Sequence, residues 1–110
     1  MFRDSGTAAA VDLSSSEFQQ RLAETQDAVL LDVRTPMEFQ MGHIPGALNL
    51  DISSPSFPAD IAELDRAGHY FVYCRSGSRS ATACSYMQQL GFSHVVNLAY
   101  GIIDWDGEIE

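Results

Sequence analysis

Positive charge is scarce in this sequence. Lys and Arg together number six against 15 Asp and Glu, so the chain of 110 residues has a formal net charge of −9. Because such a surface repels polyanions, the composition argues against binding nucleic acid or an anionic membrane. Two of the six basic residues, Arg75 and Arg79, nevertheless lie close together in the sequence.

Cysteine is also scarce. Cys74 and Cys84 are ten positions apart, without a CxxC motif or a histidine cluster beside them. This pattern excludes a disulfide framework and a structural zinc site. We expect Cys84 to lie in the core, on a helix that carries it too far from Cys74 for a disulfide.

Long apolar runs are missing as well. No stretch has the length of a membrane span, and residues 1–10 lack the hydrophobic segment of a secretory signal. We therefore expect a cytoplasmic protein without a membrane partner. Residues 1–10 are expected to be a loose lead-in, followed by a single domain over 11–110 that is long enough to bury one core.

Apolar patterns along the chain predict strands that alternate with helices. Strands are expected at 11–13, 28–31, 47–50, 70–73 and 95–98, and helices at 14–24, 36–41, 59–64, 79–90 and 101–105. Two capping boxes, Ser14 with Glu17 and Thr35 with Glu38, mark the first two helix starts. This alternation predicts an α/β fold with a mostly parallel sheet.

The position of Cys74 predicts an ionised thiol. Cys74 ends a buried strand, and a turn containing Gly77 then leads into a helix, so backbone N–H groups and the helix N-terminus are expected to face the sulfur. Each hydrogen bond to a charged group is worth roughly 1.5–3 kcal/mol, enough for a few of them to favour the thiolate at neutral pH. The alternative is an inert core cysteine.

This hypothesis makes two demands on the structure. The amide hydrogens must point at the Cys74 sulfur, and the sulfur must have an opening to water. A helix N-terminus disfavours positive charge, so we also expect Arg75 and Arg79 to attract an anion at this position.

Three stretches resemble the rhodanese-like sulfurtransferases. Residues 74–80, Cys-Arg-Ser-Gly-Ser-Arg-Ser, are similar to the active-site loop of that family. The other matching segments are Leu31-Asp32-Val33-Arg34, Glu38-Phe39, Gly42-His43-Ile44-Pro45-Gly46-Ala47, Asn49, Leu90-Gly91-Phe92, Val95 to Leu98, Gly101 and Trp105. The resemblance implies a rhodanese-like fold, in which helices flank both faces of a central five-stranded, mostly parallel sheet.

The resemblance also implies a reaction. Cys74 would attack the outer sulfur of an anionic donor such as thiosulfate, form a persulfide and pass the sulfur to a thiol or a partner protein. No metal or organic cofactor is called for. The residues expected to bind the donor are Arg75, Ser76, Gly77, Ser78, Arg79 and Ser80.

Several polar residues near this loop allow two interpretations. Asp32, Arg34 and Glu38 could supply an acid or a base, but we expect them to form a structural network that fixes the loop ends. His43 could be a general base, although its segment resembles a turn-and-strand element.

Outside the loop, His69 and His94 are expected to be exposed at the starts of strands, and Trp105 to be a packing residue. One position departs from the family pattern, because Tyr100 precedes Gly101 where two glycines are usual. If the first glycine has a positive φ, tyrosine there requires a local adjustment.

Other functions use similar residues. Phosphatases and arsenate reductases of this kind place five residues between cysteine and arginine, whereas four separate Cys74 from Arg79, which predicts a tighter loop. A persulfide carrier would use the same residues as an enzyme. A non-catalytic module that only binds a partner would not need Cys74.

Overall fold

The protein is an α/β sandwich built on one parallel sheet. The computed structural model describes residues 10–110, in which five parallel strands have the order β1-β5-β4-β2-β3. The strands are β1 (Val11–Leu13), β2 (Val29–Asp32), β3 (Leu48–Asn49), β4 (Tyr70–Tyr73) and β5 (Val95–Leu98). The helices are α1 (Ser15–Glu24), α2 (Pro36–Gln40), α3 (Phe57–Ala62), α4 (Ser78–Gln89) and the 3-10 helix η1 (Ile102–Asp104). The predicted fold class is confirmed.

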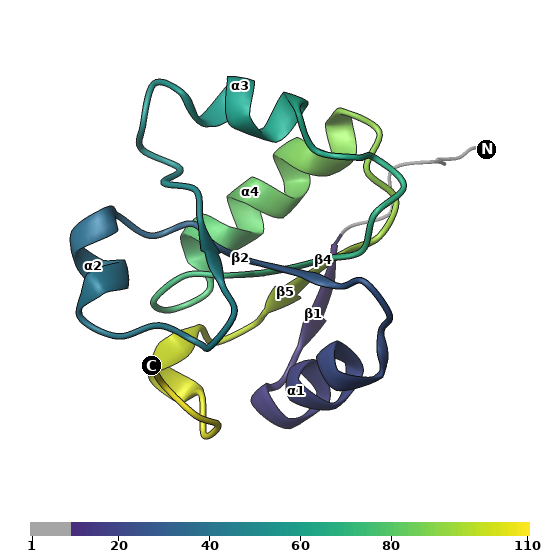
Figure 1. Ribbon diagram of the computed structural model, residues 1–110. Coiled ribbons are helices and arrows are strands. Elements are labelled where there is room, and N and C mark those ends of the chain that lie inside the picture. Colours follow the sequence, from purple (N-terminus) through teal and green to yellow (C-terminus); the bar gives the residue numbers. More distant parts are fainter. Residues whose placement is uncertain (1–9) are drawn as a thin grey trace.

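Helices cover both faces of the sheet, as Figure 1 shows. On one face, α3 and α4 bury Phe57, Ala83 and Met87 against the sheet. On the other face, Phe18 of α1 packs edge-to-face on Phe71 of β4. Because both faces are buried, the central strands are continuous apolar runs.

Local sequence signals explain where several helices begin and end. In both predicted capping boxes the hydroxyl accepts a hydrogen bond from the N–H of the glutamate three residues later, and the glutamate carboxylate accepts one in return. At the end of α4, Gly91 has a φ of +98°, and the N–H of Phe92 bonds to the Met87 carbonyl, which is a Schellman motif. Cys84 is buried on α4, as predicted.

Some boundaries differ from the prediction. The third helix begins at Phe57 rather than at residue 59, because Pro58 occupies a first-turn position where the missing N–H costs no hydrogen bond. The strand expected over 47–50 is limited to Leu48–Asn49. The spacing of Phe18, Leu22 and Ala23 predicts that all three lie on the buried face of α1, but Ala23 is exposed. The expected lead-in at residues 1–10 lies outside the described residues, except for Ala10.

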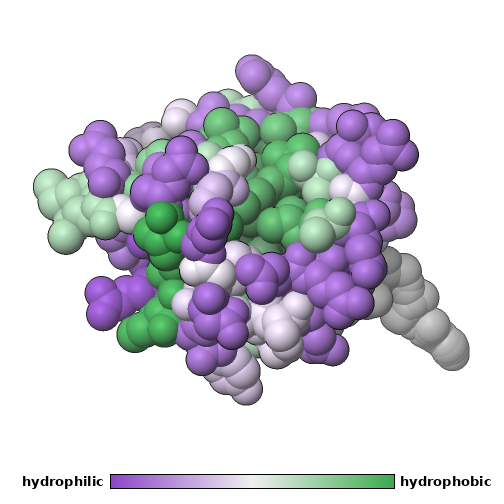
Figure 2. Space-filling model, turned by 60° about the horizontal axis from the view of Figure 1, so that its bottom comes forward, coloured by the Kyte–Doolittle hydropathy of each residue, from purple (hydrophilic) through white to green (hydrophobic). Residues whose placement is uncertain are grey.

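The surface is mostly hydrophilic. In Figure 2 the apolar side chains of one face are gathered in local patches between polar ones. Exposed large apolar residues over 10–110 are Val11, Met37, Met41, Leu48, Tyr100, Ile103 and Ile109. Within the same range, no helix combines the length and apolar character that crossing a bilayer requires.

Candidate active site

Cys74 lies at the carboxyl end of β4, the central strand of the sheet. The loop that follows contains only Arg75, Ser76 and Gly77 before α4 begins at Ser78. Gly77 has a φ of +104°, and a Cβ atom there would collide with the carbonyl oxygen of Ala99. Only glycine fits this tight turn, which brings the start of α4 back over the end of β4.

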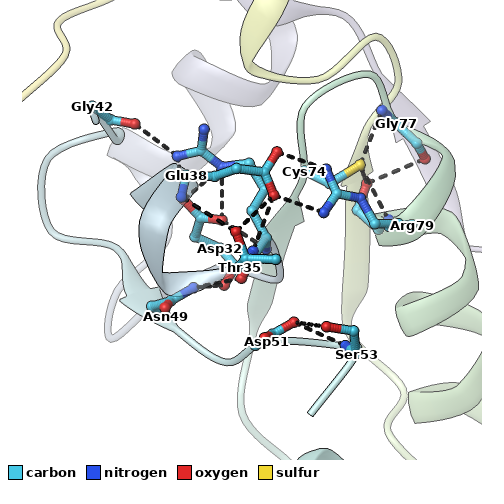
Figure 3. Close-up of polar contacts among 12 residues, drawn as sticks. Asp32, Thr35, Glu38, Gly42, Asn49, Asp51, Ser53, Cys74, Gly77 and Arg79 are labelled. Carbon is cyan, nitrogen blue, oxygen red and sulfur yellow. Dashed lines mark hydrogen bonds and ion pairs between the residues drawn. The ribbon is translucent and has the colours of Figure 1, made fainter. Parts of the chain in front are cut away.

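Three donors point at the Cys74 sulfur. The backbone N–H of Gly77 lies 3.1 Å from Sγ, the N–H of Ser80 lies 3.3 Å away, and the Ser80 hydroxyl oxygen lies 3.3 Å away. Figure 3 shows the sulfur beside Gly77 at the centre of this loop. The first demand of the sequence hypothesis, that amide hydrogens face the sulfur, is therefore met.

Hydrogen bonding outweighs burial at this thiol. Burial of Cys74 opposes ionisation, but hydrogen bonds from the Ser80 hydroxyl and from the N–H groups of Ser80, Gly77 and Ser76 lower its pKa below the ordinary value. Cys84 is the contrasting case, because burial without such donors raises the pKa of its thiol to about 12. The environment of each cysteine therefore shifts its thiol pKa in the opposite direction, down for Cys74 and up for Cys84.

The η1 segment holds the loop from outside. The N–H of Ile102 donates to the Cys74 carbonyl at 2.9 Å, and the N–H of Ile103 donates to the Arg75 carbonyl at 3.1 Å. In a planar peptide the carbonyl and the next N–H point in opposite directions, so fixing the Arg75 carbonyl outward aims the Ser76 N–H inward. The local sequence of the loop does not indicate this support, although Gly101 is a signal for it.

Gly101 is what allows η1 to approach the loop. Its φ is +72°, and a Cβ atom there would collide with the Arg75 carbonyl. The adjustment expected at Tyr100 is not needed, because over residues 10–110 the sole non-glycine residue with a positive φ is Asp27. Tyr100 is 65% exposed.

Asp32 and Arg34 form a buried ion pair below the loop. Arg34 Nη2 lies 2.7 Å from Asp32 Oδ2, and Arg34 Nε also donates to the carboxylate. Burial opposes the charge on Arg34, but Asp32 more than compensates and raises its pKa. Arg34 Nη2 also donates to the Gly42 carbonyl at 2.7 Å. This pair has the structural character expected of it.

Glu38 does not join that pair by a direct contact. Its carboxylate instead forms two bonds with Arg79, at 2.9 and 3.0 Å, and links α2 to the first turn of α4 (Figure 3). The hydrogen bond from Arg79, with those from Thr35, outweighs partial burial and lowers the pKa of Glu38 to about 2. The predicted three-residue network is therefore corrected to one pair plus a link to the loop.

The second demand, an opening to water above the sulfur, is not met in this conformation. Cys74 is only 1% exposed. The nearest cavity, of about 230 Å³, lies beside the loop and is lined by Arg34, Glu38, Met41, Arg75, Ile102 and Ile103. A donor that enters this cavity therefore needs a movement of the side chains or of the loop before it reaches Cys74.

The other residues singled out in the sequence make stacking and packing contacts. His43 stacks on Phe39 with ring centroids 3.8 Å apart, and its Nδ1 lies 2.9 Å from the Phe39 carbonyl, as a turn residue would. His69 and His94 are exposed and stack on each other at the starts of β4 and β5. Trp105 packs on Phe18, which confirms its predicted role.

Comparisons with known proteins agree with this geometry. The model of the rhodanese-like domain matches residues 14–108. A sulfurtransferase of Allochromatium vinosum is 43% identical over 94 residues, covering 86% of this chain and 86% of that protein. Thiosulfate sulfurtransferase GlpE of Pseudomonas syringae pv. syringae is 36% identical over 87 residues, covering 79% and 80% respectively. The chain belongs to the rhodanese-like family.

A solved structure has the same fold as this chain. The crystal structure of a rhodanese-like domain protein from Staphylococcus aureus has a TM-score of 0.79 at 28% identity, covering 91% of this chain and 96% of that one. Since relatives of this rhodanese-like chain are named sulfurtransferases, the comparisons support sulfur transfer as its general reaction.

The rhodanese-like loop predicts a distinct pH dependence for Cys74. Because hydrogen bonds favour the thiolate, its fraction should rise with pH through a midpoint below the ordinary value of 9.0. The ultraviolet absorbance of thiolate, taken as the difference between wild type and Cys74→Ser, measures this midpoint. Cys84 does not interfere, since its pKa is raised to about 12. A midpoint at or above 9.0 would show that burial dominates.

Proposed function

We propose that this chain is a sulfurtransferase that carries a sulfane sulfur as a persulfide on Cys74. The observation that supports this most directly is the set of three donors within 3.3 Å of the Cys74 sulfur. An inert core thiol needs no such donors, whereas a nucleophile that works as a thiolate does.

The reaction would proceed in two displacements. With thiosulfate as donor, the Cys74 thiolate attacks the outer sulfur, the sulfur–sulfur bond of thiosulfate breaks, and sulfite leaves with the electron pair. A thiolate acceptor then attacks the terminal sulfur of the Cys74 persulfide, and the Cys74 thiolate is the leaving group. No net oxidant or reductant is consumed, and no metal or organic cofactor is required.

The loop would stabilise negative charge at both stages. The N–H groups of Gly77 and Ser80 already face the Cys74 sulfur, and we expect those of the stretch 75–80 to bind the terminal sulfur of a persulfide. Fixed dipoles of this kind need no reorganisation as the charge moves from one sulfur to the next. Ser78 supplies the first residue of α4, whose N-terminus adds to the positive field.

Arginine would stabilise negative charge at the site in two ways. Arg75 is exposed and lines the cavity beside the loop, where it can attract an anion. Arg79 lies close enough to Cys74 that the negative charge on the sulfur raises the Arg79 pKa, after the larger effect of Glu38. Because Cys74 is buried, we expect a step that opens the site to precede sulfur transfer.

Three alternatives are outcomes of the test. A phosphatase would need room for a tetrahedral anion in a loop with only four residues between Cys74 and Arg79. A persulfide carrier would take up sulfur with the same residues but release it only to a dedicated protein. A module that only binds a partner would not acquire sulfur at all.

Mass spectrometry of the chain after incubation with thiosulfate tests the proposal. We expect the gain of one sulfur atom on the peptide that contains Cys74 and none on the peptide that contains Cys84. The same preparation should produce thiocyanate from thiosulfate and cyanide and should release no phosphate from an aryl phosphate. A chain that gains no sulfur from thiosulfate or from an organic persulfide would contradict the proposal.

A further inference from the structure

The charges around Cys74 are almost completely paired. Three arginines lie near the loop, but Arg34 is bonded to Asp32 and Arg79 to Glu38. Within the described range 10–110, Arg75 is the one arginine of this group without a carboxylate partner. Among the residues that the structure describes, a donor in the cavity thus meets one unpaired positive charge, the carboxylate of Glu38 and the thiolate that it must approach.

The Glu38–Arg79 pair is held in place from both sides. Glu38 Oε1 also accepts from the N–H of Thr35 at 3.1 Å and from its hydroxyl at 3.2 Å, because the same carboxylate closes the capping box of α2. Arg79 belongs to the first turn of α4, which also carries the Ser80 donors to the sulfur. Figure 3 shows the pair next to Cys74. Arg79 is therefore near the reacting sulfur, but its charge is already balanced by the carboxylate of Glu38.

Half of the residues that line the cavity have apolar side chains. Met41 and Ile103 are 85% and 66% exposed and line the cavity together with Ile102. Such side chains suit the carbon portion of an organic molecule. They offer nothing to a compact, strongly hydrated dianion, which would lose its water there without a matching set of donors.

These observations fit one class of donor better than thiosulfate. An organic persulfide has a single negative charge on its outer sulfur and an apolar carbon next to its inner sulfur. The Cys74 thiolate would attack the outer sulfur of R–S–S⁻, forming Cys74–S–S⁻ and breaking the bond between the inner and outer sulfur of the donor. The thiolate R–S⁻ would leave with the electron pair and take a proton from water, so the step needs no other reactant.

We propose that Glu38 is a specificity residue that withholds Arg79 from dianionic donors and so selects organic persulfides as the sulfur source. This inference rests on the proposed sulfur transfer through Cys74 and specifies its donor. Glu38 acts through Arg79 and through its own charge at the cavity wall.

The test compares Glu38→Gln with a matched control. Glutamine keeps the carbonyl oxygen that closes the capping box and removes the charge. Glu17 occupies the same position in the capping box of α1, where its carboxylate bonds to Ser14, so Glu17→Gln makes the same chemical change outside the site. The rate at which Cys74 acquires sulfur is measured by rapid quenching and mass spectrometry. The two donors are thiosulfate and freshly prepared 2-hydroxyethyl persulfide.

The wild type should load faster from the persulfide. Removing the negative charge of Glu38 from the cavity wall should raise the thiosulfate rate of Glu38→Gln about tenfold. Its persulfide rate should rise only about threefold, because a monoanion feels half of the repulsion that a dianion feels, and Glu17→Gln should match the wild type with both donors. The ratio of the two rates is the deciding quantity, because it does not depend on how much of a variant is correctly folded.

Other outcomes overturn the inference. An unchanged ratio in Glu38→Gln means that the residue only positions α2 and α4. A wild type that prefers thiosulfate means that the paired charges do not select the donor. If neither donor loads Cys74 in the wild type, the proposed function itself fails, and that result is distinct from the other two.

Discussion

Cys74→Ser is expected to lower sulfur transfer by at least about a thousandfold, because a serine hydroxyl at neutral pH is neither ionised nor able to carry a sulfane sulfur. The substitution keeps the size of the side chain and the donors from Gly77 and Ser80. The free energy of unfolding should therefore change by no more than about 1 kcal/mol. Steady-state thiocyanate production and thermal unfolding of the same sample measure the two effects.

Cys84→Ala is the matched control for this loss. Cys84 is fully buried on α4, and its sulfur has only a weak contact at 3.8 Å with the Val96 carbonyl. The variant should lose some stability, about 1 kcal/mol for a small cavity, but should keep its activity per folded molecule. Transfer that survives in Cys74→Ser and disappears in Cys84→Ala would show that Cys84, and not Cys74, carries the sulfur.

Asp32→Ala should cause the largest loss of stability of any change near the site. Asp32 is completely buried, and its removal leaves the Arg34 guanidinium buried without its carboxylate. Breaking a buried pair by removing one partner costs about 3–5 kcal/mol. Urea denaturation, with the midpoint and slope fitted together, measures the change in the free energy of unfolding.

Two further variants test whether the loss of stability comes from the unpaired buried charge of Arg34 or simply from the loss of a carboxylate. Asp104→Ala removes an exposed carboxylate and should change stability by less than about 0.5 kcal/mol. Replacing both partners, Asp32→Leu with Arg34→Met, should recover most of the loss because no charge is left buried alone. A double variant as unstable as Asp32→Ala would show that packing, not charge, accounts for the effect.

Local chemistry made much of this fold predictable from the sequence. Each capping box involves residues three apart, so Ser14 with Glu17 and Thr35 with Glu38 could be identified without any tertiary information. The position of Cys74 followed from a short apolar run that ends at a glycine-containing turn. The direction of the Ser80 and Gly77 donors toward the sulfur was also predictable, since a helix N-terminus presents its free N–H groups.

The parts that could not be predicted depend on contacts between distant residues. Glu38 and Arg79 are 41 positions apart, and nothing in either local sequence indicates that one neutralises the other. The burial of Cys74 depends in the same way on packing around the loop rather than on the loop itself. Pro58 was misread for a different reason, because a proline is equally compatible with a loop and with the first turn of a helix.

The contacts from η1 have a consequence for the order in which reactivity is acquired. Ile102 and Ile103 hold the backbone of Cys74 and Arg75, yet they follow the nucleophile by more than a quarter of the chain. During synthesis the cysteine therefore emerges before the segment that orients its loop. The full set of donors to the thiol is therefore expected only after the C-terminal segment has docked on the loop.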